Sequence, residues 1–330
     1  MNVMPHQGNS RISLSSLSNI PVRKVRQAFV YLNARRFGLS VENAKACAIK
    51  WNKLLASCFT QSVVGELYNT SKVRTVGFPA ERTGKELYAT AHFSAYTIVS
   101  IALSKAYGRP VYVLVGQPPK DWEDTLILSL ADAGVHGTII RSDFSQLKRV
   151  KRAIAEDAII ISLIDVPWTR DNISNRSYQS FQFGSGEIIA SYSIFKLANI
   201  VGLEPTFVLC EPSAEGFDVV HYGSLNQAEC FEKLLAAVYR APEHFERFCE
   251  LQQYYIGGNE VAEIATFQLG DHRYIVDSIR KKYWKLGEGF SAYLNQALQQ
   301  QLIPLSEITD ALLSQVYKQT GQRYDEVVFF

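Results

Sequence analysis

Short apolar and β-branched runs alternate with stretches of helical periodicity between residues 71 and 211. This alternation predicts βαβ units and a mixed, mostly parallel sheet flanked by helices. Several runs are apolar at every position, as expected of strands that are covered on both faces. The predicted strands are Leu87–Ala91, Val111–Val115, Thr138–Ile140, Ile159–Ile164, Tyr178–Phe183 and Thr206–Cys210, and the predicted helices are 94–107, 121–133, 144–156 and 187–201.

The flanking segments have other patterns. Residues 1–20 are polar and rich in Ser and Asn, which predicts a flexible arm. Residues 22–70 have apolar positions at helical spacing, and residues 227–257 predict two further helices broken at Ala241-Pro242. We therefore expect N-terminal helices that belong with the α/β block in one domain over residues 21–258.

A small C-terminal α+β domain is predicted over residues 259–330. Two β-prone pieces, Thr266–Leu269 and Tyr274–Val276, flank a tight turn at Asp271-His272. Helices are predicted near 277–286, 288–300 and 305–319.

Composition excludes several classes of protein. Hydrophobic residues make up 47% of the chain and charged residues 20%, with a net charge of +2, so nucleic acid is not an expected partner. The five cysteines are scattered without a C-x-x-C pair, which argues against zinc and disulfides and fits the cytoplasm. No run reaches the roughly 18 to 20 apolar residues of a membrane span, so we expect peripheral membrane contact at most.

His92 is the most informative candidate. It ends the predicted strand Leu87–Ala91, where the chain turns toward a helix, and sites in open α/β sheets form at that edge. Imidazole titrates near neutrality and suits general-base chemistry on a hydroxyl or an amine. Alone, a histidine at a strand end is more often a structural hydrogen-bonding residue.

The order of motifs from about residue 87 to 211 resembles the lipid A biosynthesis acyltransferases, the lauroyl and myristoyl transferases of the lysophospholipid acyltransferase superfamily. The resemblance implies a glycerolipid acyltransferase-like fold with His92 as the base. It also implies an acyl donor held as a thioester on phosphopantetheine or coenzyme A, with no other cofactor, and transfer to a hydroxyl or amine. The motifs that carry it are Ala91-His92-Phe93, Gln117-Pro118 after an apolar strand, Asp165 at the end of Ile161–Asp165, Phe181–Glu187 with Gly184, and the strand that ends in Glu211.

Two positions depart from that family. Its motif places an acid five residues after the histidine, where this chain has Thr97, which can accept a hydrogen bond but carries no charge. Either Asp165 or Glu187 replaces this acid, or His92 works alone and more slowly, or catalysis has been lost. The family's phosphate-binding arginine falls near Val113, which is apolar, so a phosphorylated acceptor is not expected. A soluble acceptor in specialised-metabolite biosynthesis fits these absences better than a lipid.

Further residues follow from this hypothesis. His92, Asp165 and Thr97 are the predicted catalytic residues, and backbone amides near residues 94–96 are the predicted oxyanion site. Asp165 and Trp168 are equally open to structural roles, as a turn cap and a core residue, and Glu187 is more simply a residue of a helix first turn. The predicted substrate-binding residues are Phe93, Ser94, Tyr96, Trp168, Arg170, Gly184 and Glu187.

Two basic clusters are candidate docking surfaces for an acidic acyl or peptidyl carrier protein. One is the run from Lys148 to Arg152, and the other combines Arg23, Lys24, Arg26, Arg35 and Arg36. The plainer reading of the first is a solvated helix face. The second could equally face an anionic membrane surface.

The C-terminal domain resembles the small peptide-binding domain of pyrroloquinoline quinone biosynthesis. The segments that carry this resemblance are His272–Asp277, Lys282–Gly287 and Tyr324–Val328. It implies a peptide or carrier-protein partner bound by strand addition. The alternative is a family-specific helical cap on the main domain.

Three functions therefore stay open. The favoured one is an acyltransferase that moves an acyl group from a carrier thioester to a small-molecule amine or hydroxyl. The others are a non-catalytic binding protein that has retained the fold, for which Thr97 is the main support, and a thioester hydrolase.

Overall fold

The chain forms two compact units, one of Lys53–Arg247 with Gln253–Ile256, and the other of Met1–Asn52, Phe248–Gln252 and Gly257–Phe330. The predicted boundary at residue 258 separates the chain differently, because it keeps the N-terminal helices with the α/β block. The computed structural model describes residues 20–58, 64–116, 120–143, 145–166, 178–251, 254–258, 264–269, 272–277, 282–285 and 324–326.

A seven-stranded sheet of order β1-β9-β8-β2-β5-β3-β4 forms the centre of the first unit. Neighbours from β8 to β4 pair in parallel, whereas β9 runs antiparallel to β8 and carries β1 parallel to itself. This confirms the predicted mixed, mostly parallel sheet. The strands are β1 (Lys72–Val76), β2 (Glu86–Thr90), β3 (Val111–Val115), β4 (Gly137–Arg141), β5 (Ile159–Leu163), β8 (Glu204–Ser213) and β9 (Gly216–Ser224).

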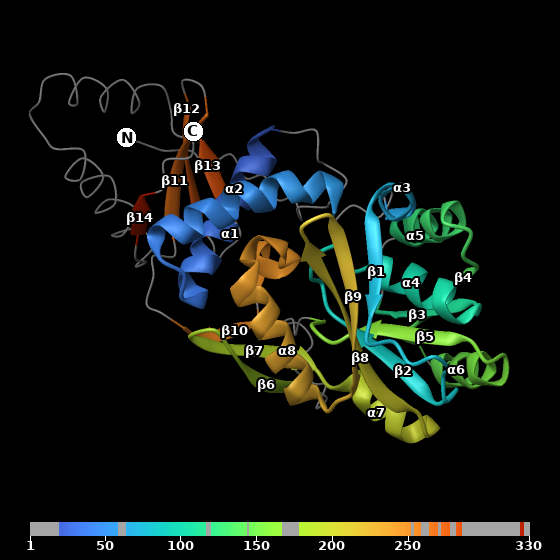
Figure 1. Cartoon of the computed structure of the whole chain (residues 1–330). Coiled ribbons are helices and arrows are strands. Elements are labelled where there is room, and N and C mark those ends of the chain that lie inside the picture. Colours follow the sequence, from blue (N-terminus) through green and yellow to red (C-terminus); the bar gives the residue numbers. More distant parts are fainter. Residues whose placement is uncertain are drawn as a thin grey trace, which may run out of the picture. The chain divides into compact units, whose positions relative to one another are not determined.

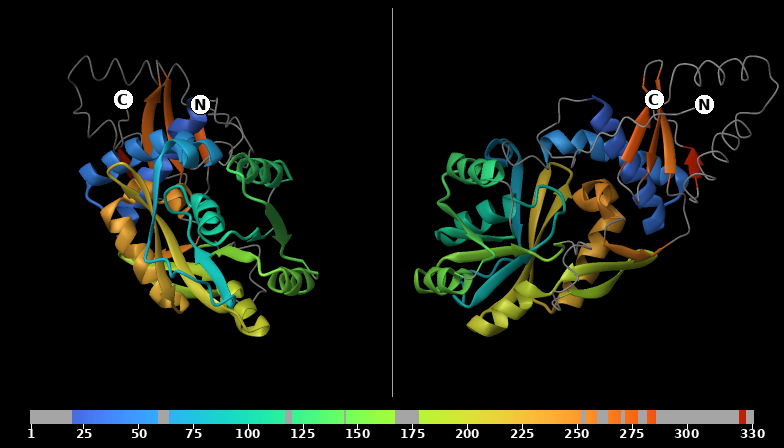
Figure 2. Two further views of the ribbon diagram at one scale, coloured as in Figure 1. Left: turned by 45° about the vertical axis from the view of Figure 1, so that its right-hand side comes forward. Right: turned by 180° about the vertical axis from the view of Figure 1, so that it is seen from behind.

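Helices cover both faces of this sheet. The connections from β2 to β3 to β4 run one way across the sheet, and those from β4 to β5 to β8 run back. Because such crossovers are right-handed, the reversal places α4 and α5 on one face and α6 and α7 on the other, as Figures 1 and 2 show. The helices are α3 (Val64–Thr70), α4 (Ile98–Tyr107), α5 (Lys120–Asp132), α6 (Gln146–Ala155), α7 (Ser193–Val201) and α8 (Gln227–Arg240).

Strand β2 lies in the middle of the core. All five of its residues are buried, and it is flanked by β8 and β5. The core of β8 is also continuously buried from Thr206 to Cys210. Rows of apolar residues on both faces of these strands drive the packing of the helix layers, since burying apolar area stabilises by about 25 cal/mol per Å².

A second, three-stranded sheet has the order β10-β7-β6. Its strands β6 and β7 come between β5 and β8 in the sequence. Strands β6 (Tyr178–Phe183) and β7 (Gly186–Ser191) form an antiparallel hairpin, with Phe183 opposite Gly186. The predicted helix over 187–201 is therefore wrong for its first part. Alternate burial along β7 shows a period of two, which belongs to a strand. The third strand is β10 (Tyr255–Gly257).

The segment after α8 is also not the long helix that was predicted. It consists of two short 3₁₀ helices, η4 (Pro242–His244) and η5 (Glu246–Cys249). Pro242 begins the first of them, at a position where its missing N–H costs no hydrogen bond.

The second unit contains α1 (Ile20–Phe37), most of α2 (Val41–Ser57) and a sheet of order β13-β12-β11-β14. Strands β11 (Ile264–Leu269) and β12 (His272–Asp277) pair antiparallel with Leu269 opposite His272, so His272 is in a strand and not in the turn. Strand β13 (Lys282–Lys285) replaces part of the helix predicted near 277–286, and β14 is Tyr324–Glu326. The predicted arm up to residue 19 and the helices 288–300 and 305–319 lie outside the described residues.

Candidate active site

His92 and Asp165 follow two neighbouring parallel strands at the same edge of the sheet. Thr90 at the end of β2 lies opposite Leu163 at the end of β5, and each site residue comes two positions later. The amide of Ile164 donates to the carbonyl oxygen of Thr90 at 2.8 Å, which extends the pairing beyond the strands. Parallel pairing therefore brings together two of the predicted catalytic residues, although 73 positions separate them in the chain.

The Asp165 carboxylate contacts His92 with both of its oxygens. Oδ1 lies 2.8 Å from the ring Nδ1, and Oδ2 accepts the backbone N–H of His92 at 3.0 Å. Burial alone would raise the pKa of Asp165, but attraction to His92, the hydrogen bonds with that residue and attraction to Arg247 outweigh it and lower the pKa. Asp165 is fully buried, so the carboxylate holds the imidazole in a fixed orientation.

Arg247 occupies the other side of the imidazole. Its Nη2 lies 2.8 Å from Nε2 of His92. A guanidinium has only donors, so Nε2 must accept this hydrogen bond and the ring proton must be on Nδ1, where it is donated to Asp165. The site is thus a linear array of carboxylate, neutral imidazole and guanidinium.

A short backbone ladder places Arg247 next to His92. Phe93 and Phe245 form an isolated antiparallel bridge. The amide of Glu246 donates to the carbonyl oxygen of His92 at 3.0 Å, and the amide of Ser94 donates to that of His244 at 2.7 Å. The segment after η4 is in this way fixed along the turn that carries His92.

An aromatic cluster packs against this ladder. Phe245 and Phe93 are fully buried, and the Phe245 ring centroid lies 5.3 Å from that of Phe183 on the β6–β7 hairpin. Phe183 in turn meets Phe231 of α8 edge to face at 6.5 Å. The hairpin and α8 therefore pack, through Phe183, against the residue that lies two positions before Arg247.

The other predicted residues near His92 have different places. Tyr96 meets the His92 ring edge-on, with ring centroids 4.8 Å apart. Phe93 is a core residue of the bridge. Thr97 is buried, and its hydroxyl has no hydrogen-bond partner within the described part of the chain, so Thr97 does not orient His92.

The predicted oxyanion role of the amides near 94–96 is wrong for Ser94. Helix α4 begins only at Ile98, and the Ser94 amide is bonded to the carbonyl of His244. The Ser94 backbone has a φ of 55°, a left-handed conformation that is uncommon for a residue other than glycine. Its hydroxyl lies 3.2 Å from Nδ1 of His244. This conformation lets the chain turn sharply between β2 and α4.

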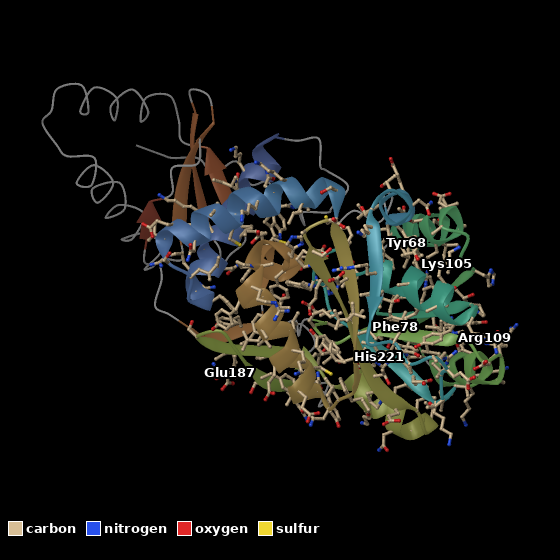
Figure 3. The ribbon with its side chains drawn as sticks, in the orientation of Figure 1. Tyr68, Phe78, Lys105, Arg109, Glu187 and His221 are labelled. Atoms are coloured by element: carbon tan, nitrogen blue, oxygen red, sulfur yellow. The ribbon has the colours of Figure 1, made fainter. Side chains whose placement is uncertain are left out.

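Glu187 does not join the site. It is exposed on the strand β7 and not in the first turn of a helix, and Figure 3 shows it on the β6–β7 hairpin. Gly184 forms the hairpin turn, with a φ of 65°, and its carbonyl oxygen accepts a hydrogen bond from the side-chain Nε2 of Gln182. Trp168 and Arg170 lie outside the described residues.

Two arginines of the basic run on α6 are in ion pairs. On α6, Arg149 pairs with Asp143 and Arg152 pairs with Glu156, which leaves Lys148 and Lys151 as exposed charges.

In the N-terminal cluster, Arg26 and Arg36 are buried in α1, so neither can belong to a docking surface. Lys24 and Arg35 are only partly buried, and Arg35 donates to the carbonyl of Leu39. The side chain of Arg23 lies outside the described residues.

Among the described residues, no group of three or more His, Cys, Asp or Glu side chains could hold a metal ion. All five cysteines are free thiols. Within the same residues, no helix has the length and apolar character needed to cross a membrane.

Comparison with family models finds no match, and comparison with curated proteins finds no significant similarity. The Asp165–His92–Arg247 array is therefore the observation on which an assignment of function depends. Arg247 has no local signal in the sequence, because its position comes from the bridge between Phe93 and Phe245.

Proposed function

We propose that the chain is an acyltransferase with a glycerolipid acyltransferase-like fold, in which His92 is the general base. The observation that carries the proposal is the Asp165–His92 pair at the ends of β2 and β5. Asp165 supplies from a neighbouring strand the acid that the resembled family has at the position of Thr97. A base held by a buried carboxylate is typical of acyl-transfer sites.

The proposed reaction uses both ring nitrogens of His92. Nε2 of His92 takes the proton of an acceptor amine or hydroxyl as the acceptor nitrogen or oxygen attacks the carbonyl carbon of a thioester. The new C–N or C–O bond forms, the C–S bond breaks, and the imidazolium returns its proton to the departing sulfur. Asp165 holds the Nδ1 proton throughout and stabilises the charged ring.

Two partners are part of this proposal. The donor is an acyl or peptidyl carrier protein, or coenzyme A, and the acceptor is a small molecule. On α6, Lys148 and Lys151 remain exposed and offer a weak positive surface to an acidic carrier.

One observation favours a second candidate, a binding protein without catalysis. The lone pair of Nε2, which a base needs, is bonded to Arg247 in this structure. A ligand-binding site in which His92 and Arg247 together recognise an anion would use the same residues without a chemical step.

Acyl transfer is tested by mixing the protein with acyl carrier thioesters and a pool of amines and alcohols, then measuring the carrier by intact-mass spectrometry. We expect acceptor-dependent loss of the acyl group, reduced about 10²- to 10⁴-fold in His92→Asn. His136→Asn, at an exposed position directly before β4, is the matched control and should keep full activity.

The other outcomes separate the alternatives. Acyl loss that needs no acceptor would identify a hydrolase. No loss with any donor, from a protein that still binds the carrier, would favour the binding protein. Transfer by folded His92→Asn at the wild-type rate would remove His92 from the mechanism.

A further inference from the structure

We propose that strand β6 is an interface between two copies of this chain, which pair antiparallel about a two-fold axis at Ser180. The two three-stranded sheets then form one continuous sheet, in the order β10-β7-β6-β6-β7-β10. This inference is independent of the proposed function, because it rests on the backbone and the charge of β6 alone.

Strand β6 lies at one end of its sheet and pairs there with β7 (Figure 1). It is the longest of the edge strands that the structure describes, which also include β1, β4, β10, β13 and β14. Sheet edges are usually protected from other chains by charge, proline, a bulge or a short length. The sequence of β6, Tyr178-Gln-Ser-Phe-Gln-Phe183, has no charged residue and no proline, and its register with β7 is regular. It therefore lacks each of these protections.

The edge strand β1 of the large sheet is the opposite case. It carries Lys72 and Arg74, which pair with Glu215 and Asp218. If two copies paired antiparallel through the centre of β1, Arg74 would lie opposite Arg74, and like charges in that position are destabilising. No such repulsion arises at β6, where every residue is uncharged, so this strand is compatible in charge with its own copy.

The free edge of β6 presents the backbone N–H and C=O groups of alternate residues. In an antiparallel pair, opposite residues alternate between exchanging both hydrogen bonds and exchanging none. Ile189 of β7 lies opposite Ser180, and its amide donates at 2.7 Å to the carbonyl oxygen of Tyr254, on the side of β7 away from β6. Ser180 is therefore in a pair without hydrogen bonds, and its own N–H and C=O point away from β7.

Tyr178 and Gln182 follow the same alternation. Ser191, which lies opposite Tyr178, donates its amide at 3.3 Å to the carbonyl oxygen of Val166 and not to β6. The N–H and C=O groups of Tyr178, Ser180 and Gln182 thus all point to the free edge. Within the described part of the chain, no backbone group forms a hydrogen bond with them there.

These outward-pointing groups select the register of the two copies. Outward residues must lie opposite one another for hydrogen bonds to form, so Ser180 lies opposite Ser180 of the second copy, and Tyr178 lies opposite Gln182. A shift of one residue would place outward residues opposite inward ones and lose these bonds. A shift of two residues, with the axis at Phe181, would keep only the pairing of Ser180 with Gln182.

The side chains of β6 agree with this pairing. The ring of Phe181 stacks on that of Phe231 of α8, with centroids 4.5 Å apart. Because side chains alternate along a strand, Ser180 and Gln182 are on the opposite face, where both are exposed. The small Ser180 side chain at the axis leaves the two backbones free to approach.

The test measures the mass of the full-length protein by sedimentation velocity over a range of concentrations. We expect a reversible dimer. Ser180→Lys places two like charges opposite each other at the axis, and Ser180→Pro removes an outward amide without removing a bond to β7. Each should raise the dissociation constant about tenfold or more. Thr75→Lys, which adds the same charge to an exposed position of the edge strand β1, is the matched control and should leave it unchanged.

A charge exchange tests the register and shows that the variants are folded. Ser180→Glu alone should also weaken the dimer, whereas a mixture of Ser180→Lys and Ser180→Glu should form a dimer with one copy of each, because opposite charges then meet at the axis. Hydrogen exchange adds a local measurement. The peptide that covers β6 should exchange more slowly in wild-type protein than in Ser180→Lys.

A wild-type protein that stays monomeric at every concentration would overturn the inference, and slow exchange of β6 in that monomer would show that another part of the same chain covers the edge. A dimer that Ser180→Lys and Ser180→Pro leave intact would place the interface elsewhere, and failure of the mixture to associate would reject this register. Acyl transfer by a monomer would leave the proposed function standing without the interface, and a dimer that consumes no thioester would leave the interface standing without the proposed function.

Discussion

At the scale of single residues, Asp165 has two tasks, since one oxygen orients the His92 ring and the other holds its backbone amide. An asparagine in its place could accept only one of these hydrogen bonds and would turn an N–H toward the other donor. We expect Asp165→Asn to lower the free energy of unfolding at pH 7 by about 1–3 kcal/mol.

The pH dependence of this loss follows from the pKa of Asp165, which the fold lowers below its usual 3.8. A carboxyl group with a lowered pKa stabilises the fold above its unfolded pKa and loses that effect as pH falls through the folded pKa. The difference between wild type and Asp165→Asn should therefore be constant above pH 3.8 and shrink below it.

Urea unfolding of the two proteins from about pH 3 to pH 7 measures this difference. Asp124→Asn, which removes an exposed carboxyl group of α5, is the control and should leave the curve nearly unchanged. A difference between wild type and Asp165→Asn that grows in acid would contradict the assignment of the charged carboxylate.

At the scale of elements, the bridge between Phe93 and Phe245 depends on the β6–β7 hairpin and α8. Phe245→Ala removes a fully buried ring that packs on Phe183, so we expect a loss of about 3–5 kcal/mol in the free energy of unfolding. Because Arg247 is two residues further on and its Nη2 is bonded to Nε2 of His92, the ¹⁵N resonance of this Nε2 should also move toward the position of a nitrogen without a hydrogen bond.

The control for this prediction is Phe245→Leu, which keeps most of the apolar volume and should lose less stability. Chemical denaturation measures the free energies of unfolding. The ¹⁵N spectrum of protein labelled with ring-¹⁵N histidine, recorded at low denaturant, shows whether Nε2 of His92 is still hydrogen-bonded. If Phe245→Ala loses stability but leaves the resonance in place, the hairpin does not position Arg247.

Local pattern was enough to predict many of these elements. Strands β3 and β6 coincide with their predicted ranges, because β3 is apolar at every position and three of the six residues of β6 are aromatic. Strand β7 was predicted as helix, because Ile188 and Ala190 fit either period over so short a run, and only pairing with β6 decides between them. Strands β1 and β9 were missed.

The candidate site divides in the same way. His92 and Asp165 end two apolar strands, and parallel pairing of neighbouring strands brings such ends together, so both were accessible from sequence. Arg247 was not accessible in this way. It is placed by the bridge between Phe93 and Phe245, which lie 152 residues apart in the chain, and no local periodicity indicates its position. The same holds for the buried state of Arg26 and Arg36 in α1.

At the scale of the whole molecule, the order of the large sheet separates protected strands from edges. Strands β2, β5 and β8 are interior, and β1 and β4 are at the two ends. Strand β1 is mostly exposed, and charged pairs such as Arg74–Asp218 link it to β9. Exposed charged edges of this kind hinder pairing with another chain and add little stability.

Hydrogen exchange measured by mass spectrometry tests this order, because amides exchange last where the local free energy of opening approaches the global value. We expect peptides that cover β2, β5 and β8 to keep their protection longest, and peptides that cover β1 to exchange well before them. The site residues follow β2 and β5, so His92 and Asp165 would then be anchored to the most stable part of the sheet. Exchange of β2 or β5 earlier than β1 would show that the strands carrying the site are not the stable centre of the fold, and that the fixed carboxylate and imidazole assumed for the base are not maintained in solution.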